Sequence, residues 1–212
     1  MSITHHLDDA TLMSFAAGAL PAALAAVVAA HVEMCARCRQ EVGVLERVGG
    51  ALLAELAPAA LERPQPPQPI RTPAGVAEPI VGGDSRARIP PPVAGLIRGD
   101  LDDASWRWLA PGVWDHMLPL SGAGKLRLLK VAPGRGVPEH GHGGTEITLV
   151  LRGSFHDEIG RYLRGDVAEL DEAVAHKPVA DMGGDCICLV GSDEPERFHG
   201  LLARYWQRLR RF

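Results

Sequence analysis

The sequence predicts an α + β protein of two domains, an N-terminal helical bundle followed by a C-terminal all-β domain. Residues 8–57 are rich in Ala, Leu and Val, and nine of the 17 prolines lie within 64–92. After them come short apolar or β-branched runs separated by Gly, Pro or Asp. A chain of 212 residues can hold one or two compact domains. We therefore assign residues 1–62 to the helical domain, 63–97 to a linker and 98–212 to the β domain.

Three helices are expected in the first domain. Asp8 or Asp9 is placed to cap the first helix, because a carboxylate accepts hydrogen bonds from the N–H groups of the first turn. Gly18 and Pro21 mark the end of that helix and the start of the next, and Pro58 ends the last helical stretch.

The uncharged, alanine-rich run Phe15–Ala30 has the sequence of neither a secretion signal nor a membrane span. No basic stretch precedes it, Gly18 and Pro21 interrupt it, and its sixteen residues are too few to cross a bilayer. We therefore expect a cytoplasmic protein without a membrane partner. In that compartment cysteines stay reduced, and paired cysteines hold metal more often than they form disulfides.

The proline-rich segment predicts a semi-rigid tether that holds the two domains apart as mechanically independent units. Beyond it, four runs alternate or are β-branched, which is the pattern of strands in a sandwich or barrel. These runs are Lys125–Val131, Thr145–Arg152, Gly165–Leu170 and Cys186–Val190.

The net charge of −4 is unevenly distributed and argues against nucleic acid as a partner. Residues 1–62 carry 3 basic and 7 acidic side chains, and residues 100–195 carry 9 and 16. Acidic surfaces repel the phosphate backbone, and the helical domain has only Arg37, Arg39 and Arg47 to neutralise phosphates. We therefore expect no direct nucleic acid binding.

The segment His31-Val-Glu-Met-Cys35-Ala-Arg-Cys38 has the spacing of a metal site. Residues four apart share a helix face, so His31 and Cys35 can converge at the end of a helix while the next turn brings Cys38 to them. Tetrahedral Zn²⁺ needs four N or S ligands, and either His5 or His6 can supply the fourth. A redox Cys-x-x-Cys pair is disfavoured because that motif accompanies a βαβ unit, which this domain lacks.

With a histidine 25 positions upstream of His31, this pattern resembles the signature of zinc-binding anti-sigma domains. These are small helical modules that bind an extracytoplasmic-function sigma factor and block its access to RNA polymerase. The resemblance covers about residues 1–57 and selects His6 over His5. It implies a set of four zinc ligands, namely His6, His31, Cys35 and Cys38.

The family domain usually adds a fourth helix that helps to clasp the sigma factor, and here the chain departs from the pattern. No helix of about three turns fits between Pro64 and Pro79. Either the fourth helix is short or absent, or Val93–Leu101 takes its role.

A second group of metal-ligand residues lies in the β domain. Same-parity residues of a strand share a face, so His140, His142 and Glu146 can point into one interior, and His176 can reach it from another strand. Three imidazoles and one carboxylate suit a divalent metal, with Zn²⁺ the first choice and Mn²⁺, Fe²⁺ or Ni²⁺ as alternatives. With their flanking glycines, these residues resemble both halves of the cupin signature, which implies an antiparallel jelly-roll barrel.

Two further cysteines, Cys186 and Cys188, fall on one face of a predicted strand. We interpret them as small buried core residues, since thiols two residues apart on a strand would form a strained disulfide.

The order of modules, a zinc anti-sigma domain, a tether and one cupin, resembles the ChrR family of anti-sigma factors. That resemblance implies a cytoplasmic regulator, without catalytic residues, that inhibits a group IV, RpoE-like sigma factor. It also implies that the cupin is needed to release the sigma factor under oxidative stress such as singlet oxygen, by oxidation, by a regulatory protease or by both. The alternative is a metal-dependent cupin dioxygenase or isomerase that carries a zinc-binding interaction domain.

Overall fold

The computed structural model describes most of the two predicted domains. The described residues are 2–59, 89–97, 100–137, 140–141, 143–171, 176–193 and 197–198. Most of the predicted linker therefore lies outside the described residues, as does His142.

Three helices form the N-terminal part, as the sequence predicts: α1 (Asp9–Ala16), α2 (Ala22–Met34) and α3 (Ala36–Ala54). Asp8 caps α1, and its carboxylate accepts the Thr11 N–H at 2.6 Å. Gly18 follows α1 with φ of 67°, a left-handed conformation that glycine adopts without a steric penalty. Pro21 immediately precedes α2, where its missing N–H costs nothing.

The C-terminal part consists of antiparallel strand pairs, which agrees with the predicted jelly-roll class. A six-stranded sheet has the order β1-β2-β3-β10-β5-β8, a three-stranded sheet the order β7-β6-β9, and β11 pairs with β4. The strands of the large sheet are β1 (Arg107–Ala110), β2 (Val113–Met117), β3 (Lys125–Val131), β5 (Glu146–Arg152), β8 (Val167–Leu170) and β10 (Cys186–Ser192). The others are β4 (His140–Gly141), β6 (Ser154–His156), β7 (Arg161–Leu163), β9 (Val179–Ala180) and β11 (Arg197–Phe198).

The centre of the large sheet is buried on both faces. Six consecutive residues of β5 and six of β10 are buried. On β10, Cys186, Cys188 and Val190 belong to the core inside the barrel, whereas Ile187 and Leu189 belong to a second core on the opposite face. Alternation of side chains along a strand produces this division.

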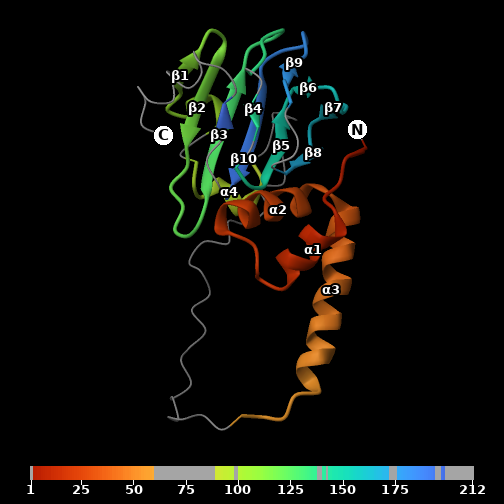
Figure 1. Cartoon of the computed structure of the whole chain (residues 1–212). Coiled ribbons are helices and arrows are strands. Elements are labelled where there is room, and N and C mark those ends of the chain that lie inside the picture. Colours follow the sequence, from red (N-terminus) through yellow and green to blue (C-terminus); the bar gives the residue numbers. More distant parts are fainter. Residues whose placement is uncertain are drawn as a thin grey trace.

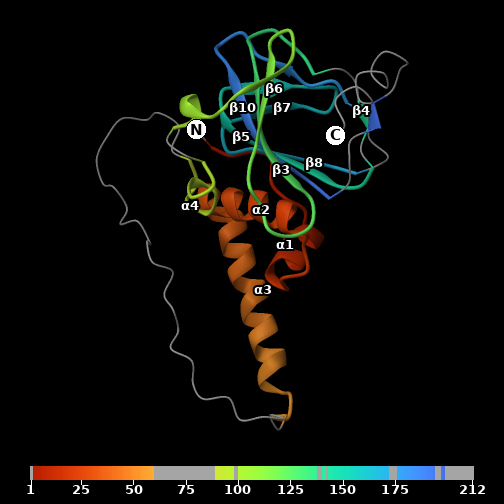
Figure 2. The ribbon, with the colours of Figure 1, turned by 90° about the vertical axis from the view of Figure 1, so that its left-hand side faces the viewer.

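The helices supply the partner for that opposite face. One continuous core joins residues of α1, α2 and α3 to Leu126, Leu128, Ile147, Leu149 and Leu189 of the sheet. Figure 1 shows α2 lying across the lower end of the strands, and Figure 2 shows the same arrangement from the side. The expectation of two domains held apart is therefore wrong: the described parts of both domains share one hydrophobic core.

The residues assigned to the end of the linker also belong to this core. A short helix, α4 (Pro91–Ala94), packs against α2. Val93, Ile97 and Leu101 are each at most 4% exposed. The side chains of Val93, Ile97 and Leu101 are thus occupied by contacts within this chain.

Within the described residues, no helix has the length and apolar character required to cross a membrane.

The close contact between α2 and β10 yields a first prediction. A Cβ atom at Gly191 would lie 2.6 Å from the Ala23 carbonyl oxygen, so the helix can approach the sheet only over a glycine. We expect Gly191→Ala to lower the free energy of unfolding by ~1–3 kcal/mol, the usual cost of overpacking. Urea denaturation monitored by circular dichroism measures this change.

Gly95→Ala is the matched control, because a Cβ there meets no atom within 4 Å and the backbone has φ of −70°. It should leave stability within about 1 kcal/mol of the starting value. Equal effects of the two substitutions would contradict a tight helix–sheet contact.

Candidate metal centre

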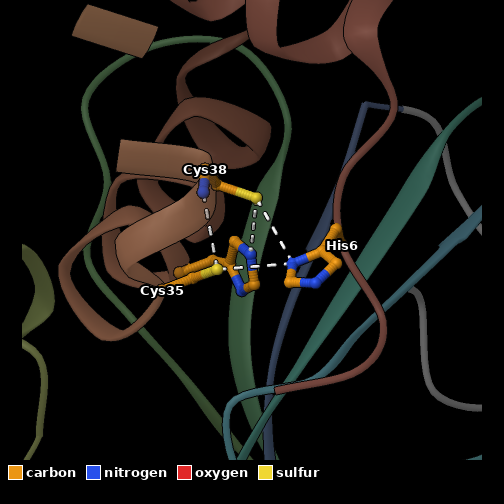
Figure 3. Close-up of side chains that lie close together, drawn as sticks. His6, Cys35 and Cys38 are labelled. Carbon is orange, nitrogen blue, oxygen red and sulfur yellow. Dashed lines mark hydrogen bonds between the residues drawn. The ribbon is translucent and has the colours of Figure 1, made fainter. Parts of the chain in front are cut away.

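Four potential metal ligands converge where the N-terminal segment meets the junction of α2 and α3. His6 lies ahead of α1, His31 in the last turn of α2, Cys35 between the helices and Cys38 in the first turn of α3. One ligand atom from each residue lies within 4.8 Å of all the others. Figure 3 shows His6, Cys35 and Cys38 directed toward one another.

The distances within this cluster match the edges of a zinc tetrahedron. His31 Nε2 lies 3.3 Å from Cys38 Sγ, and His6 Nδ1 lies 3.3 Å from Cys35 Sγ and 3.6 Å from Cys38 Sγ. Zn–S and Zn–N bonds of tetrahedral geometry place S and N about 3.6 Å apart. The donor set and its spacing therefore fit Zn²⁺.

Burial shifts the pKa values of the two inner ligands, His31 and Cys38, in opposite directions. It lowers the pKa of His31 to about 4, which keeps the imidazole neutral and able to coordinate. It also raises the pKa of Cys38 to about 12, with the neighbouring Cys35 adding to the effect. Because zinc binds the thiolate, the ion must displace the Cys38 proton, and zinc binding at this site releases a proton.

The β domain orients one of these ligands. The Nδ1 atom of His31 lies 3.0 Å from the Gly165 carbonyl oxygen, which fixes Nδ1 as the protonated nitrogen and turns Nε2 toward Cys38. Gly165 lies in the turn after β7 with φ of 94°. A Cβ there would lie 2.8 Å from Ile3, so the close approach also depends on a glycine.

The residue after this glycine holds the N-terminal segment. The buried Asp166 carboxylate accepts N–H groups from Thr4 at 2.7 Å, His5 at 3.0 Å and Leu163 at 2.8 Å. Burial opposes ionisation, but these donors hold the pKa of Asp166 below its ordinary value. His5 itself packs on the ring of Tyr162, with ring centroids 4.5 Å apart. Of the two histidines, His6 is therefore the one in the cluster.

The cupin candidates are described only in part. Glu146 has the same strand parity as Val150, so its side chain faces the barrel interior, where it is 3% exposed. His176 is also 3% exposed, and its Nδ1 lies 3.2 Å from Asp157 Oδ2. The backbone of His140 lies on β4, whereas its side chain and all of His142 fall outside the described residues.

The sequence did not point to Asp157 or Asp166, and it indicated Gly165 only as one of the glycines that flank the cupin ligands. The contact from His31 to Gly165 spans 134 residues, and that from Thr4 to Asp166 spans 162. No local spacing rule connects such positions. The one available signal is that Asp166 directly precedes an apolar strand, where a buried carboxylate needs donors.

Cys186 and Cys188 are buried inside the barrel, with Sγ atoms 3.7 Å apart. The hydrogen bond with Cys186 and burial raise the pKa of Cys188. They form part of the interior core, as the sequence indicates.

An exposed apolar surface runs along α3, away from the metal cluster at the start of that helix. Of α3, only Cys38 and Val42 are buried, and the helix projects away from the sheet (Figure 1). Residues spaced four apart form an exposed apolar stripe: Val44, Val48 and Leu52 on α3, and Leu56 just beyond its C-terminal end, which are 45–68% exposed. At its base, a hollow of about 300 Å³ is lined by Asp9, Leu12, Met13, Glu41, Val44 and Leu45.

The structure therefore defines the class of the protein as a helical module with a zinc-type ligand cluster, packed on a cupin-like β domain, and comparisons with known proteins agree. Residues 10–39 match the family "Putative zinc-finger", and residues 95–194 match the family "ChrR Cupin-like domain". The first range contains His31, Cys35 and Cys38 but not His6, and the second contains strands β1 to β10.

The chain is 42% identical to the anti-sigma-E factor ChrR of Cereibacter sphaeroides over 214 aligned residues, which cover 98% of each chain. It is also similar, with 41% identity and a TM-score of 0.75, to a chain in the crystal structure of Rhodobacter sphaeroides SigE in complex with the anti-sigma ChrR. That match covers 91% of this chain and all of the other. The chain therefore belongs to the ChrR family of anti-sigma factors, which are not enzymes.

The cluster geometry yields a prediction about metal content. Cys38→Ala removes one corner of the tetrahedron, so we expect zinc affinity to fall more than ~100-fold, beyond the loss typical of an outer contact. Cobalt substitution followed by absorption spectroscopy checks it, because thiolate-to-cobalt bands arise only where cysteines bind the ion.

Cys186→Ala is the matched control, since this buried cysteine lies in the barrel. It should keep the thiolate bands of the starting protein. Bands that survive Cys38→Ala and disappear in Cys186→Ala would contradict the site.

Proposed function

We propose that this protein is an anti-sigma factor that binds and inhibits an extracytoplasmic-function, RpoE-like sigma factor. The observation that carries the proposal is the apolar stripe of α3, on a chain that is similar over nearly its whole length to an anti-sigma-E factor. An exposed stripe of large apolar residues along a helix and its C-terminal end is typical of a surface that binds another protein.

The position of the stripe supports this role. Val48, Leu52 and Leu56 lie beyond the part of α3 that packs on α1 and α2, so they contribute little to the core of this chain. Burying a leucine side chain in an interface is worth about 1.5–3 kcal/mol. Together with the hollow beside α1, the stripe offers a partner helix enough area for specific binding.

Zinc bound by His6, His31, Cys35 and Cys38 sets the direction of this surface. Cys35 lies between α2 and α3, and its Sγ lies 3.5 Å from the Cys38 N–H nitrogen at the start of α3. A metal that joins both thiols to His31 fixes the angle between the two helices. The ion therefore acts on binding through the geometry of α3 and takes no part in a reaction.

A second divalent metal, with Zn²⁺ the first choice, is bound in the barrel by His140, His142, Glu146 and His176. Buried carboxylate and imidazole groups are donors that such ions accept. This site makes the β domain the part that responds to oxidative stress such as singlet oxygen. The response ends inhibition either directly or by exposing the chain to a protease.

The partner is a protein, with no direct contact to nucleic acid or to a membrane, and the protein acts in the cytoplasm. The acidic balance of residues 1–62, with 7 acidic and 3 basic side chains, disfavours contact with phosphates.

Substitution within the stripe tests sigma binding. Leu52, 62% exposed, should tolerate a charge in the unbound protein but not in an apolar interface. We expect Leu52→Glu to weaken binding at least ~10-fold while leaving the free energy of unfolding within about 0.5 kcal/mol. Titration calorimetry with the sigma factor and inhibition of its transcription in vitro provide the measurement.

Met182→Glu is the matched control, because Met182 is 80% exposed on the β domain, away from α3. It should bind as the starting protein does. Full affinity in Leu52→Glu would show that α3 is not the docking surface.

Substitutions at the barrel site separate inhibition from its release. Glu146→Ala should preserve sigma inhibition at rest, because the Glu146 side chain faces the barrel interior, on the opposite face of β5 from the helical core. Under singlet oxygen, we expect a sigma-dependent reporter to respond more slowly or not at all. His116→Ala, a histidine on β2 that contacts the Ser105 carbonyl, is the matched control and should respond normally. Loss of inhibition in folded barrel variants would contradict this division of roles.

A further inference from the structure

One segment of the β domain contacts both candidate metal sites. It runs from Asp157, directly after β6, through β7 to Asp166, directly before β8. Figure 1 shows these strands beside the N-terminal segment of the chain. The segment comprises the turn of the β6–β7 hairpin, its second strand β7 and the turn that leads to β8, and is called the 157–166 hairpin.

The N-terminal end of the hairpin contacts His176, a candidate ligand of the barrel metal. The Asp157 side chain is fully buried, and its Oδ2 lies 3.2 Å from His176 Nδ1. Its other oxygen, Oδ1, accepts the N–H groups of Ile159 at 2.9 Å and Gly160 at 3.0 Å. A carboxylate on one imidazole nitrogen directs the other nitrogen toward a metal and increases its basicity. Asp157 is therefore placed to position His176.

The second end holds the zinc module. The Gly165 carbonyl accepts a hydrogen bond from His31 Nδ1, and Asp166 accepts the backbone N–H groups of Thr4 and His5. The next residue along the chain, His6, belongs to the zinc cluster. Two of the four cluster residues are thus held, directly or through one peptide bond, by two adjacent residues of the hairpin.

The middle of the hairpin joins these ends through packed groups. Asp157 N–H donates to the Gly160 carbonyl at 2.9 Å, which closes the turn. A Cβ at Gly160 would lie 3.3 Å from His5 Nε2, so the turn touches the N-terminal segment. Tyr162 lies between His5 and Phe155, with ring centroids 4.5 and 4.7 Å away. Tyr162 and Phe155 are buried, and close-packed groups of this kind transmit displacement because they are hard to compress.

We propose that the 157–166 hairpin couples the two metal sites, with Asp157 as the positioning residue for His176 and Asp166 as the anchor of the zinc-bearing N-terminal segment. This rests on the proposed barrel metal. A change in the ligation of His176 moves the Asp157 carboxylate, the turn and then the Gly165–Asp166 contacts. Coupling between two sites is reciprocal. A substitution at Asp166 should therefore also weaken binding of the barrel metal, although Asp166 lies nine positions from Asp157.

The experiment uses the full chain loaded with zinc and two readouts. The first is the number of zinc ions per chain and their release rates to a chelator, with Cys38→Ala and His176→Ala identifying the two release phases. The second is hydrogen exchange of the Thr4 and His5 amides, which donate to Asp166 and touch neither metal.

We expect two zinc ions per chain in the starting protein. Asp157→Asn should weaken the barrel zinc ~10–100-fold, the range for loss of a carboxylate behind a histidine ligand. It should also speed exchange at the Thr4 and His5 amides at least ~5-fold, the lower end of measured couplings. His176→Ala should have the same effect on exchange, and the double variant should add nothing further.

A second variant keeps the test valid if Asp157→Asn fails to fold. Asp166→Asn leaves His176 and Asp157 intact, and coupling predicts at least ~5-fold faster release of the barrel zinc. Asp185→Asn, an exposed acidic residue before β10, is the matched control and should change neither readout.

Two results would overturn the proposal, and they are distinguishable. One zinc per chain would show that the barrel holds no metal, which removes the proposed barrel site together with the coupling. Two zinc ions, with exchange at Thr4 and His5 unaffected by His176→Ala and release of the barrel zinc unaffected by Asp166→Asn, would retain both sites and eliminate the link between them.

Discussion

The structure depends on helix α2 being buried on several sides at once. Ala23, Val27 and Val28 are fully buried, and the helix packs on β10, β5 and α4 as well as on its own neighbours. A helix can lie this close to a sheet only if its contact residues are small, and Gly191 provides the space beneath Ala23. The packing of α2 on the sheet therefore determines the position of His31 and, with it, of the zinc cluster.

Apolar and polar contacts have different roles where the helices meet the β domain. The apolar core supplies most of the favourable free energy, but apolar surfaces alone specify register weakly. Register comes from the polar contacts of Gly165 with His31 and of Asp166 with Thr4 and His5, each of which would lose its buried hydrogen bonds if the helices slid. The β domain is therefore part of the zinc module's structure, and removing it would expose the apolar residues of α2 that pack on the large sheet.

Local rules predicted most of the elements and the cluster residues, and non-local packing accounts for what they missed. The Asp8 cap, the break at Gly18 and the spacing of His31, Cys35 and Cys38 all act within a few residues. The sequence does contain a pattern that indicates the packing of the two domains on each other. α2 has no charged residue over its first nine positions, and β5 and β10 are apolar at consecutive positions. Both patterns are typical of elements buried on every side. The partners of Asp157 and Asp166 left no such signal.

The same packing limits how a signal in the barrel can reach the surface of α3. The barrel interior and the helical core lie on opposite faces of one sheet, and β5 and β10 separate them. A signal changes partner affinity only by altering the free energies of the bound and unbound states differently. Movement of the sheet itself would disturb both cores at high cost, whereas the 157–166 hairpin lies at the side and touches the N-terminal segment and His31 directly. Since His31, Cys35 and Cys38 join α2 to α3, a small displacement at Gly165 acts on the angle of α3, at whose far end the apolar stripe lies.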